Sequence, residues 1–185
     1  MKTLVSKTRV LSTVFVVLVP IVSLAATPST APKAGDMAAG GNLGFVAPLD
    51  GPFDNLEPAI TGTFEYYTTP RISWRGLLGF TSFSADLPGD PKVNVAFVNA
   101  SFVYNWERGN VHPFATAGIG VYGKNGSSGL PSEFDETVFG VNAGGGIDWF
   151  LGSRWGLKFE GSMHAVTGED PNTFFLGTAG FMFWF

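Results

Sequence analysis

Six ionisable residues lie within segments that are otherwise apolar: Glu65, Arg75, Asp148, Lys158, Glu160 and His164. A buried charge without a partner is costly, so ion pairing is the chemistry expected of these side chains. One tight turn would set Glu65 beside Arg75, and a second would set Asp148 opposite Lys158. The spacing therefore predicts an internal charge network rather than a reactive site.

His164 has the greatest catalytic potential, because an imidazole can activate a neighbouring hydroxyl. Ser162 shares its strand face, but two residues along a strand separate side chains by about 7 Å, too far for a direct hydrogen bond. The segment also departs from the His-x-Ser pair of lipid A deacylases, because Val166 replaces the serine. We therefore predict no enzyme and assign His164 to the charge network as a polar filler.

Metal and cofactor sites are not predicted. The chain has no cysteine, and its two histidines, His112 and His164, fall at opposite ends of the predicted strands. The acidic run at 133–136 lacks the spacing of a calcium loop. The glycines at 144–146 lack the Lys-Ser/Thr pair and the helix of a phosphate loop.

Strands must position these residues, because apolar and polar residues alternate with a period of two after residue 40. The pattern predicts eight strands, each near the length that crosses a bilayer at a tilt, at 41–48, 59–68, 71–84, 93–106, 111–123, 137–151, 154–166 and 173–185. Gly, Asn or Thr interrupts every long apolar stretch outside the N-terminus. Membrane crossing would therefore need strands closed into a barrel.

The predicted connections alternate in length. Tight turns fall at 69–70, 107–110 and 152–153, and longer polar segments fall at 49–58, 85–92, 124–136 and 167–172. Ten of the 15 acidic residues lie in or beside the longer segments. Short turns on the side of the termini and longer loops opposite are typical of membrane barrels.

Alternation also predicts which side chains face lipid and which face the lumen. In the strand 154–166 the lipid-facing set is Trp155, Leu157, Phe159, Met163 and Ala165, and the lumenal set is Lys158, Glu160, Ser162 and His164. In the strand 71–84 the lumenal set is Arg71, Ser73, Arg75 and Thr81. Leu77, Phe83 and Phe97 break the rule by pointing inward, so a mixed interior is predicted.

The N-terminus predicts export. Residues 1–9 are basic, residues 10–22 are apolar, and Ser23-Leu24-Ala25 offers a small-x-small cleavage site, so we predict a signal peptide over 1–25. The Ala- and Pro-rich segment 26–40 predicts a flexible periplasmic lead, and 41–185 the barrel domain.

The C-terminus ends on an aromatic residue within an alternating strand. Gly180, Phe183 and Phe185 resemble the C-terminal signal by which outer-membrane barrels are recognised for insertion. The expected partners are barrel-assembly machinery, outer-membrane lipid and lipopolysaccharide. A formal net charge of −4 argues against nucleic acid as a partner.

The segment 112–122, continued by 139–149 and 155–160, resembles small outer-membrane β-barrel proteins of the opacity-protein and OmpA-barrel-like type. The resemblance implies an all-β, eight-stranded antiparallel up-and-down transmembrane barrel in the cell outer membrane. Members of that family are structural, adhesive or weakly channel-forming.

Three functions follow, in order. The first is a structural or surface-interaction role with a salt-bridged lumen and no wide pore, because eight strands leave an interior only just wide enough for side chains. The second is a narrow channel for small ions or hydrophobic molecules. The third is a lipid A-modifying enzyme.

Overall fold

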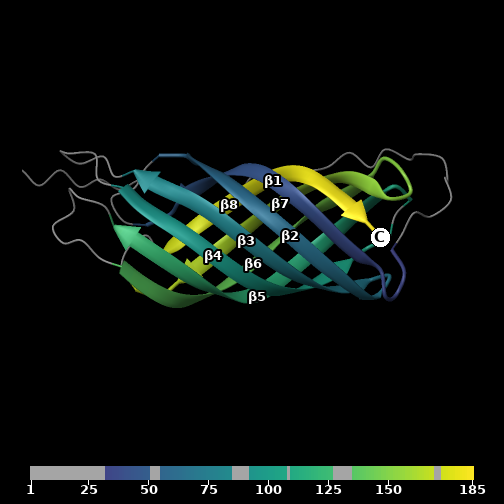
Figure 1. Ribbon diagram of the computed structural model, residues 1–185, viewed down its shortest axis with the longest axis horizontal. Coiled ribbons are helices and arrows are strands. Elements are labelled where there is room, and N and C mark those ends of the chain that lie inside the picture. Colours follow the sequence, from purple (N-terminus) through teal and green to yellow (C-terminus); the bar gives the residue numbers. More distant parts are fainter. Residues whose placement is uncertain (1–31, 51–54, 85–91, 108, 127–134, 169–171) are drawn as a thin grey trace, which may run out of the picture.

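The computed structural model shows a closed barrel of antiparallel strands (Figure 1). It describes residues 32–50, 55–84, 92–107, 109–126, 135–168 and 172–185. The eight strands are β1 (Met37–Pro48), β2 (Glu57–Thr69), β3 (Ile72–Ser84), β4 (Lys92–Asn105), β5 (Val111–Gly126), β6 (Asp135–Phe150), β7 (Trp155–Val166) and β8 (Thr173–Trp184). Each strand pairs with its neighbours in sequence, and β1 pairs with β8 to close the barrel.

The predicted fold class is confirmed, and every strand end lies within four residues of its predicted place. The largest difference is at β1, which begins at Met37, inside the segment expected to be a flexible lead. The predicted signal peptide lies outside the described residues. Among the described residues, no helix has the length and apolar character needed to span a membrane.

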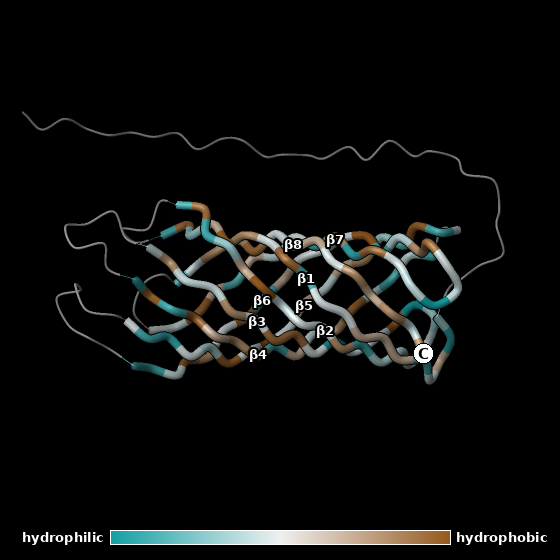
Figure 2. Tube along the Cα trace, turned by 45° about the horizontal axis from the view of Figure 1, so that its top comes forward, coloured by the Kyte–Doolittle hydropathy of each residue, from teal (hydrophilic) through white to brown (hydrophobic). Residues whose placement is uncertain are grey.

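The barrel wall separates two kinds of side chain. Along β7, Trp155 and Met163 are exposed on the outside, whereas Lys158 and His164 are each 1% exposed on the inside. Apolar residues dominate the middle of the strands and hydrophilic residues the ends (Figure 2). The predicted inward positions of Leu77, Phe83 and Phe97 are confirmed, because all three are buried. The period-two pattern therefore sets the orientation of nearly every strand residue.

Arg71 is the exception, and its predicted lumenal position is wrong. The pairing of β2 with β3 shifts register between Tyr67 and Thr69, so Arg71 falls in the turn rather than in the strand. Its side chain is 64% exposed and pairs with Glu107 at 3.4 Å. Parity fails here because the turn interrupts the alternation before the strand begins.

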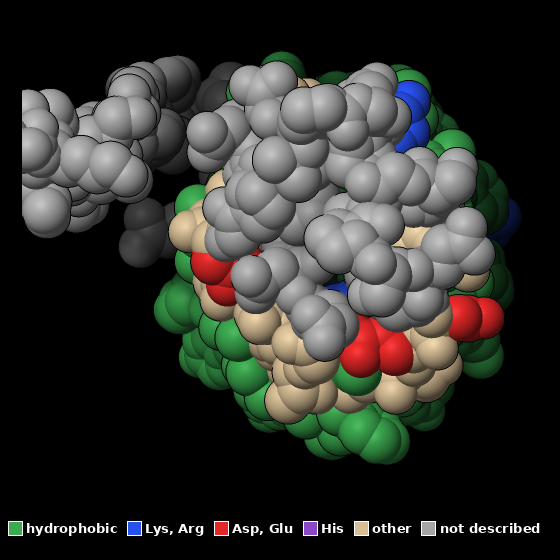
Figure 3. Space-filling model, turned by 90° about the vertical axis from the view of Figure 1, so that its left-hand side faces the viewer, with side chains coloured by type: hydrophobic (Ala, Val, Ile, Leu, Met, Phe, Trp, Pro, Cys, Tyr) green, Lys and Arg blue, Asp and Glu red, His purple; other side chains and the backbone are tan. Residues whose placement is uncertain are grey.

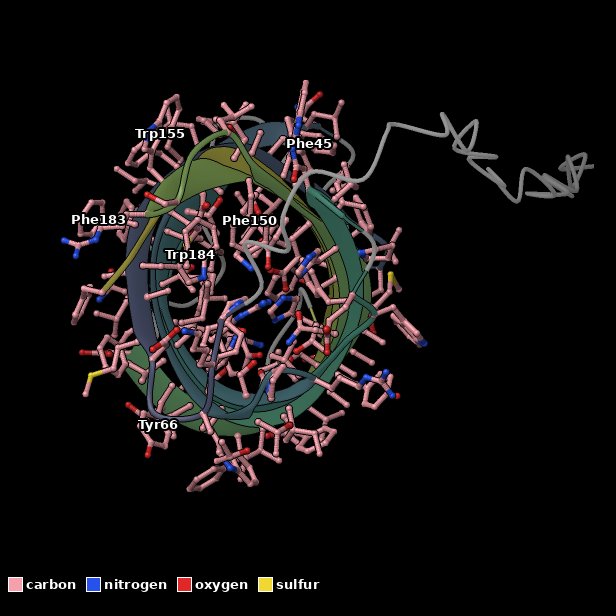
Figure 4. The ribbon with its side chains drawn as sticks, turned by 90° about the vertical axis from the view of Figure 1, so that its right-hand side faces the viewer. Phe45, Tyr66, Phe150, Trp155, Phe183 and Trp184 are labelled. Atoms are coloured by element: carbon pink, nitrogen blue, oxygen red, sulfur yellow. The ribbon has the colours of Figure 1, made fainter. Side chains whose placement is uncertain are left out.

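The two ends of the barrel differ. Both the described start of the chain and its C-terminus lie at the end of the tight turns, where Trp155 and Phe183 point outward and Phe150 and Trp184 point into the lumen (Figure 4). At the opposite end acidic side chains lie on the rim above an apolar outer wall (Figure 3). We call these the turn end and the loop end.

Candidate functional site

The lumen is the candidate site, because it collects the buried polar and charged side chains. Its contents form layers in the order in which residues follow one another along each strand. From the turn end, β7 contributes Lys158, Glu160, Ser162 and His164 in turn, all pointing inward. We describe four layers: a turn-end plug, a charge layer, an amide layer and an outer aromatic layer.

The turn-end plug consists of Ala38, Tyr67, Phe150, Met182 and Trp184. The Phe150 and Trp184 rings lie 4.4 Å apart, and the Trp184 indole donates a hydrogen bond to the Tyr67 hydroxyl at 3.3 Å. His112 stacks beside Phe150 at 4.7 Å. Aromatic rings therefore fill the lumen next to the turns.

The charge layer is organised by Arg75, which crosses the lumen. Its Nη2 lies 3.0 Å from Glu65 Oε2 on β2, the neighbouring strand. Its Nη1 lies 2.7 Å from Glu160 Oε2 on β7, across the barrel. One guanidinium therefore links two carboxylates from strands that are not adjacent, a geometry that suits its planar fork of donors.

Lys158 supplies the second cation of the charge layer. Its Nζ lies 2.7 Å from Asp148 Oδ1 and 3.6 Å from Glu65 Oε2. The Phe114 ring lies 4.3 Å from this ammonium and 4.5 Å from the Arg75 guanidinium, so both cations contact one aromatic face. The layer is a connected network rather than two separate pairs.

Neutral donors complete the network. The Ser73 hydroxyl donates to Glu65 Oε1, and Asn105 Nδ2 donates to Ser73 Oγ at 3.4 Å. Glu65 is fully buried, and Arg75 is 3% exposed. Every predicted network residue except His164 therefore meets in this layer, where burial makes each charge depend on its partner.

His164 lies nearer the loop end, in the outer aromatic layer, which we define as Phe97, Tyr122, His164 and Phe174. Its ring stacks on Phe174 at 4.7 Å with an interplanar angle of 7°. Its Nδ1 lies 2.8 Å from the Tyr122 hydroxyl. Its assignment to the charge network is therefore corrected: hydroxyls and aromatic rings surround this imidazole.

The expected separation of Ser162 from His164 is also wrong. Ser162 Oγ lies 3.0 Å from His164 Nε2, because the imidazole turns back along β7 and spans the distance between the two backbone positions. A serine and a histidine therefore do meet. Ser162 is 4% exposed and His164 1%, so the pair is closed to a substrate in this conformation.

The amide layer, which sequence reasoning missed, lies between the charge layer and the outer aromatic layer. Its amides are Asn42, Asn99 and Asn142, with hydroxyls from Thr61, Thr63 and Ser101. Asn42 Nδ2 donates to Thr61 at 3.0 Å and to Thr63 at 3.1 Å, and Ser101 donates to Asn142 Oδ1 at 3.1 Å. The period-two pattern could have found these residues, since each asparagine stands at an inward position.

Lys124 was also missed, because residues 124–136 were predicted to form a loop. It belongs to β5, is 1% exposed, and donates to the Thr167 carbonyl at 3.3 Å and to Asn172 Oδ1 at 3.4 Å. Its Nζ also lies 3.8 Å from Glu136. This cation joins β5, β6 and the β7–β8 connection at the loop end.

The histidines do not share a site. His112 lies at the turn end, with its Nε2 3.0 Å from the Gly109 carbonyl oxygen, whereas His164 lies in the outer aromatic layer. In the described part of the chain, no three His, Cys, Asp or Glu side chains cluster as metal ligands would. The layers thus order charges and rings, and they gather no ligand set for a metal.

Comparison with known proteins identifies the family. The family model of the outer membrane protein β-barrel domain matches residues 15–183. The chain belongs to this family. The predicted resemblance and the predicted outer-membrane location are thereby confirmed. No curated protein matches the chain significantly.

Solved structures share the fold of this outer-membrane barrel. OprG of Pseudomonas aeruginosa has a TM-score of 0.69 at 14% identity, over 85% of this chain and 99% of that one. Neisserial surface protein A has a TM-score of 0.61 at 13% identity, over 80% and 95%. Ail of Yersinia pestis has a TM-score of 0.55 at 13% identity, over 82% and 99%. At these identities the likeness concerns the fold alone.

The C-terminal residues of the outer-membrane barrel lie in and just beyond β8. Phe183 and Phe185 are exposed on the outer wall, at 43% and 58%, while Trp184 between them points into the turn-end plug. Gly180 faces the lumen beside Asn42. The Met37 and Phe185 backbones exchange hydrogen bonds of 3.0 and 2.9 Å, so the final residue takes part in closing the barrel.

Proposed function

We propose that this outer-membrane barrel has a structural or surface-interaction role and contains no wide pore. The observation that carries the proposal is the filling of the lumen by the charge layer and the outer aromatic layer. Arg75 and Phe97, at the centres of these layers, are each 3% exposed. A wide aqueous path would leave such side chains in contact with solvent.

The surface available to partners is the loop end. Acidic residues described there include Asp50, Glu57, Asp135 and Glu136. Ail, an attachment invasion locus protein of the same fold, has been crystallised with the heparin analogue sucrose octasulfate. An acidic rim would repel such a polyanion, so we propose a cationic partner surface for this chain.

Two partners follow from the membrane setting. Outer-membrane lipid and lipopolysaccharide would surround the apolar wall. The barrel-assembly machinery would recognise β8 through Gly180, Phe183 and Phe185, of which the two aromatic residues remain on the outer face after folding. Replacing Phe185 with Ser should lower the fraction inserted into the outer membrane. Normal insertion of that variant would remove this signal from the proposal.

A narrow channel is the second candidate, and the amide layer favours it, because neutral polar groups in mid-lumen could pass small solutes. We propose no catalytic role for Ser162 and His164, because neither the hydroxyl nor the imidazole reaches the surface.

A strain that lacks the protein separates the first two candidates. The structural proposal predicts greater sensitivity to detergent and to large antibiotics, restored by the wild-type chain. Normal barrier function together with slower uptake of a small solute would overturn it in favour of the channel.

A further inference from the structure

The amide layer contains polar atoms that protein groups leave unsatisfied. Four buried amide atoms find no hydrogen-bond partner among the described residues: Asn42 Oδ1, Asn99 Oδ1, Asn99 Nδ2 and Asn142 Nδ2. Their residues are 4%, 2% and 7% exposed, in the order Asn42, Asn99, Asn142. Buried amides in folded proteins nearly always have a partner, so these four atoms indicate one that is not protein.

Glycine leaves room for that partner. Inward positions of the strands beside the asparagines carry no side chain: Gly118, Gly120, Gly144 and Gly180. A Cβ at Gly120 would collide with the Asn99 carboxamide, and a Cβ at Gly180 would collide with that of Asn42. The amides therefore lie against the wall, over the glycines, and this level of the lumen holds few side-chain atoms.

Denser layers bound this level on both sides. Toward the turn end, Arg75 and Lys158 are held by three carboxylates in the charge layer. Toward the loop end, Phe97 stacks on Tyr122 at 5.7 Å and lies 6.5 Å from Phe174. A molecule in the amide layer would be enclosed.

The unsatisfied atoms define the chemistry of the occupant. Two are carbonyl oxygens that accept hydrogen bonds, and two are amide nitrogens that donate them. A cation would satisfy only the oxygens and an anion only the nitrogens. We propose that the amide layer is an enclosed binding chamber for ordered water, a small neutral molecule that both donates and accepts.

Water-edited solid-state NMR of the protein in lipid bilayers tests the chamber directly. The side-chain amides of Asn99 and Asn142 should receive magnetisation from water several-fold faster than that of Asn105. Asn105 is a matched control, because it is 2% exposed and its Nδ2 is bonded to Ser73. Equal, slow transfer to all three would show a dry layer, and equal, fast transfer would show that water is not confined to it. Either result overturns the proposal.

A variant tests whether the amides share one chamber. Asn99→Leu removes two of the four unsatisfied atoms and fills part of the space, so transfer from water to Asn142 should slow several-fold. An unchanged rate at Asn142 would overturn the shared chamber. A heat-dependent shift in electrophoretic mobility checks that the barrel has folded, and Asn99→Val serves the same purpose if the leucine variant does not fold.

Discussion

The charge layer and the outer aromatic layer close the same lumen by different physics. In the charge layer, Arg75 holds Glu65 at 3.0 Å and Glu160 at 2.7 Å, and each charge depends on a specific partner. In the outer aromatic layer, rings fill space and the one ionisable group, His164, contacts hydroxyls and rings. The first layer should tolerate loss of a member poorly, whereas the second should lose stability in proportion to the volume removed.

The largest effect is expected from Arg75→Ala. The variant leaves Glu65 and Glu160 buried without the guanidinium, and breaking a buried pair in this way costs about 3–5 kcal/mol. Denaturant unfolding in lipid vesicles would measure the loss. Adding Glu65→Ala should recover part of it, and no recovery would show that the pair does not act as a unit.

The next effect is expected from Phe97→Ala in the outer aromatic layer. Removing a buried phenylalanine leaves a cavity and costs about 3 kcal/mol. Phe102→Ala on the same strand is the control, because Phe102 is 40% exposed on the outer wall and lipid can replace its contacts. Equal losses of unfolding free energy in the two variants would contradict tight packing around Phe97.

A smaller effect is expected from the hydrogen bond between Tyr122 and His164. Tyr122→Phe should cost about 1 kcal/mol, since the ring packing remains and one hydrogen bond is lost. Combining it with His164→Phe completes a double-mutant cycle for unfolding. Strict additivity would show that the 2.8 Å contact contributes nothing to stability.

The smallest effect is expected from Arg71→Ala. This side chain is 64% exposed and its pair with Glu107 lies at the turn end, so solvent screens the interaction. The unfolding free energy should fall by less than about 0.5 kcal/mol, against the several kcal/mol expected for Arg75. A loss as large as that of Arg75→Ala would restore the lumenal position predicted from parity.

The two layers also differ in how far the sequence predicts them. Glu65 and Arg75 face each other across one hairpin, so alternation and a tight turn suffice to place them together. The link from Arg75 to Glu160 joins β3 to β7 and needs the closed barrel. The outer aromatic layer draws on β4, β5, β7 and β8, so no local pattern shows that Phe97, Tyr122 and His164 would meet.

Some errors of prediction have local causes. Arg71 has the parity of a lumenal residue, but a register shift ends the alternation before it. Ser162 and His164 are separated along the backbone, yet the length of the imidazole allows a 3.0 Å contact. Lys124 looks like a loop residue until β5 is seen to continue to Gly126. Strand ends and side-chain reach are set by neighbours that a linear pattern does not contain.

Planar-bilayer recording of the folded wild-type protein tests the closed lumen most directly. A heat-dependent shift in electrophoretic mobility would first establish that the sample is a closed barrel. With the charge layer and the outer aromatic layer both intact, the recording should show no stable openings at any salt concentration. Steady, ion-selective openings from that sample would contradict the filled lumen and favour the narrow channel.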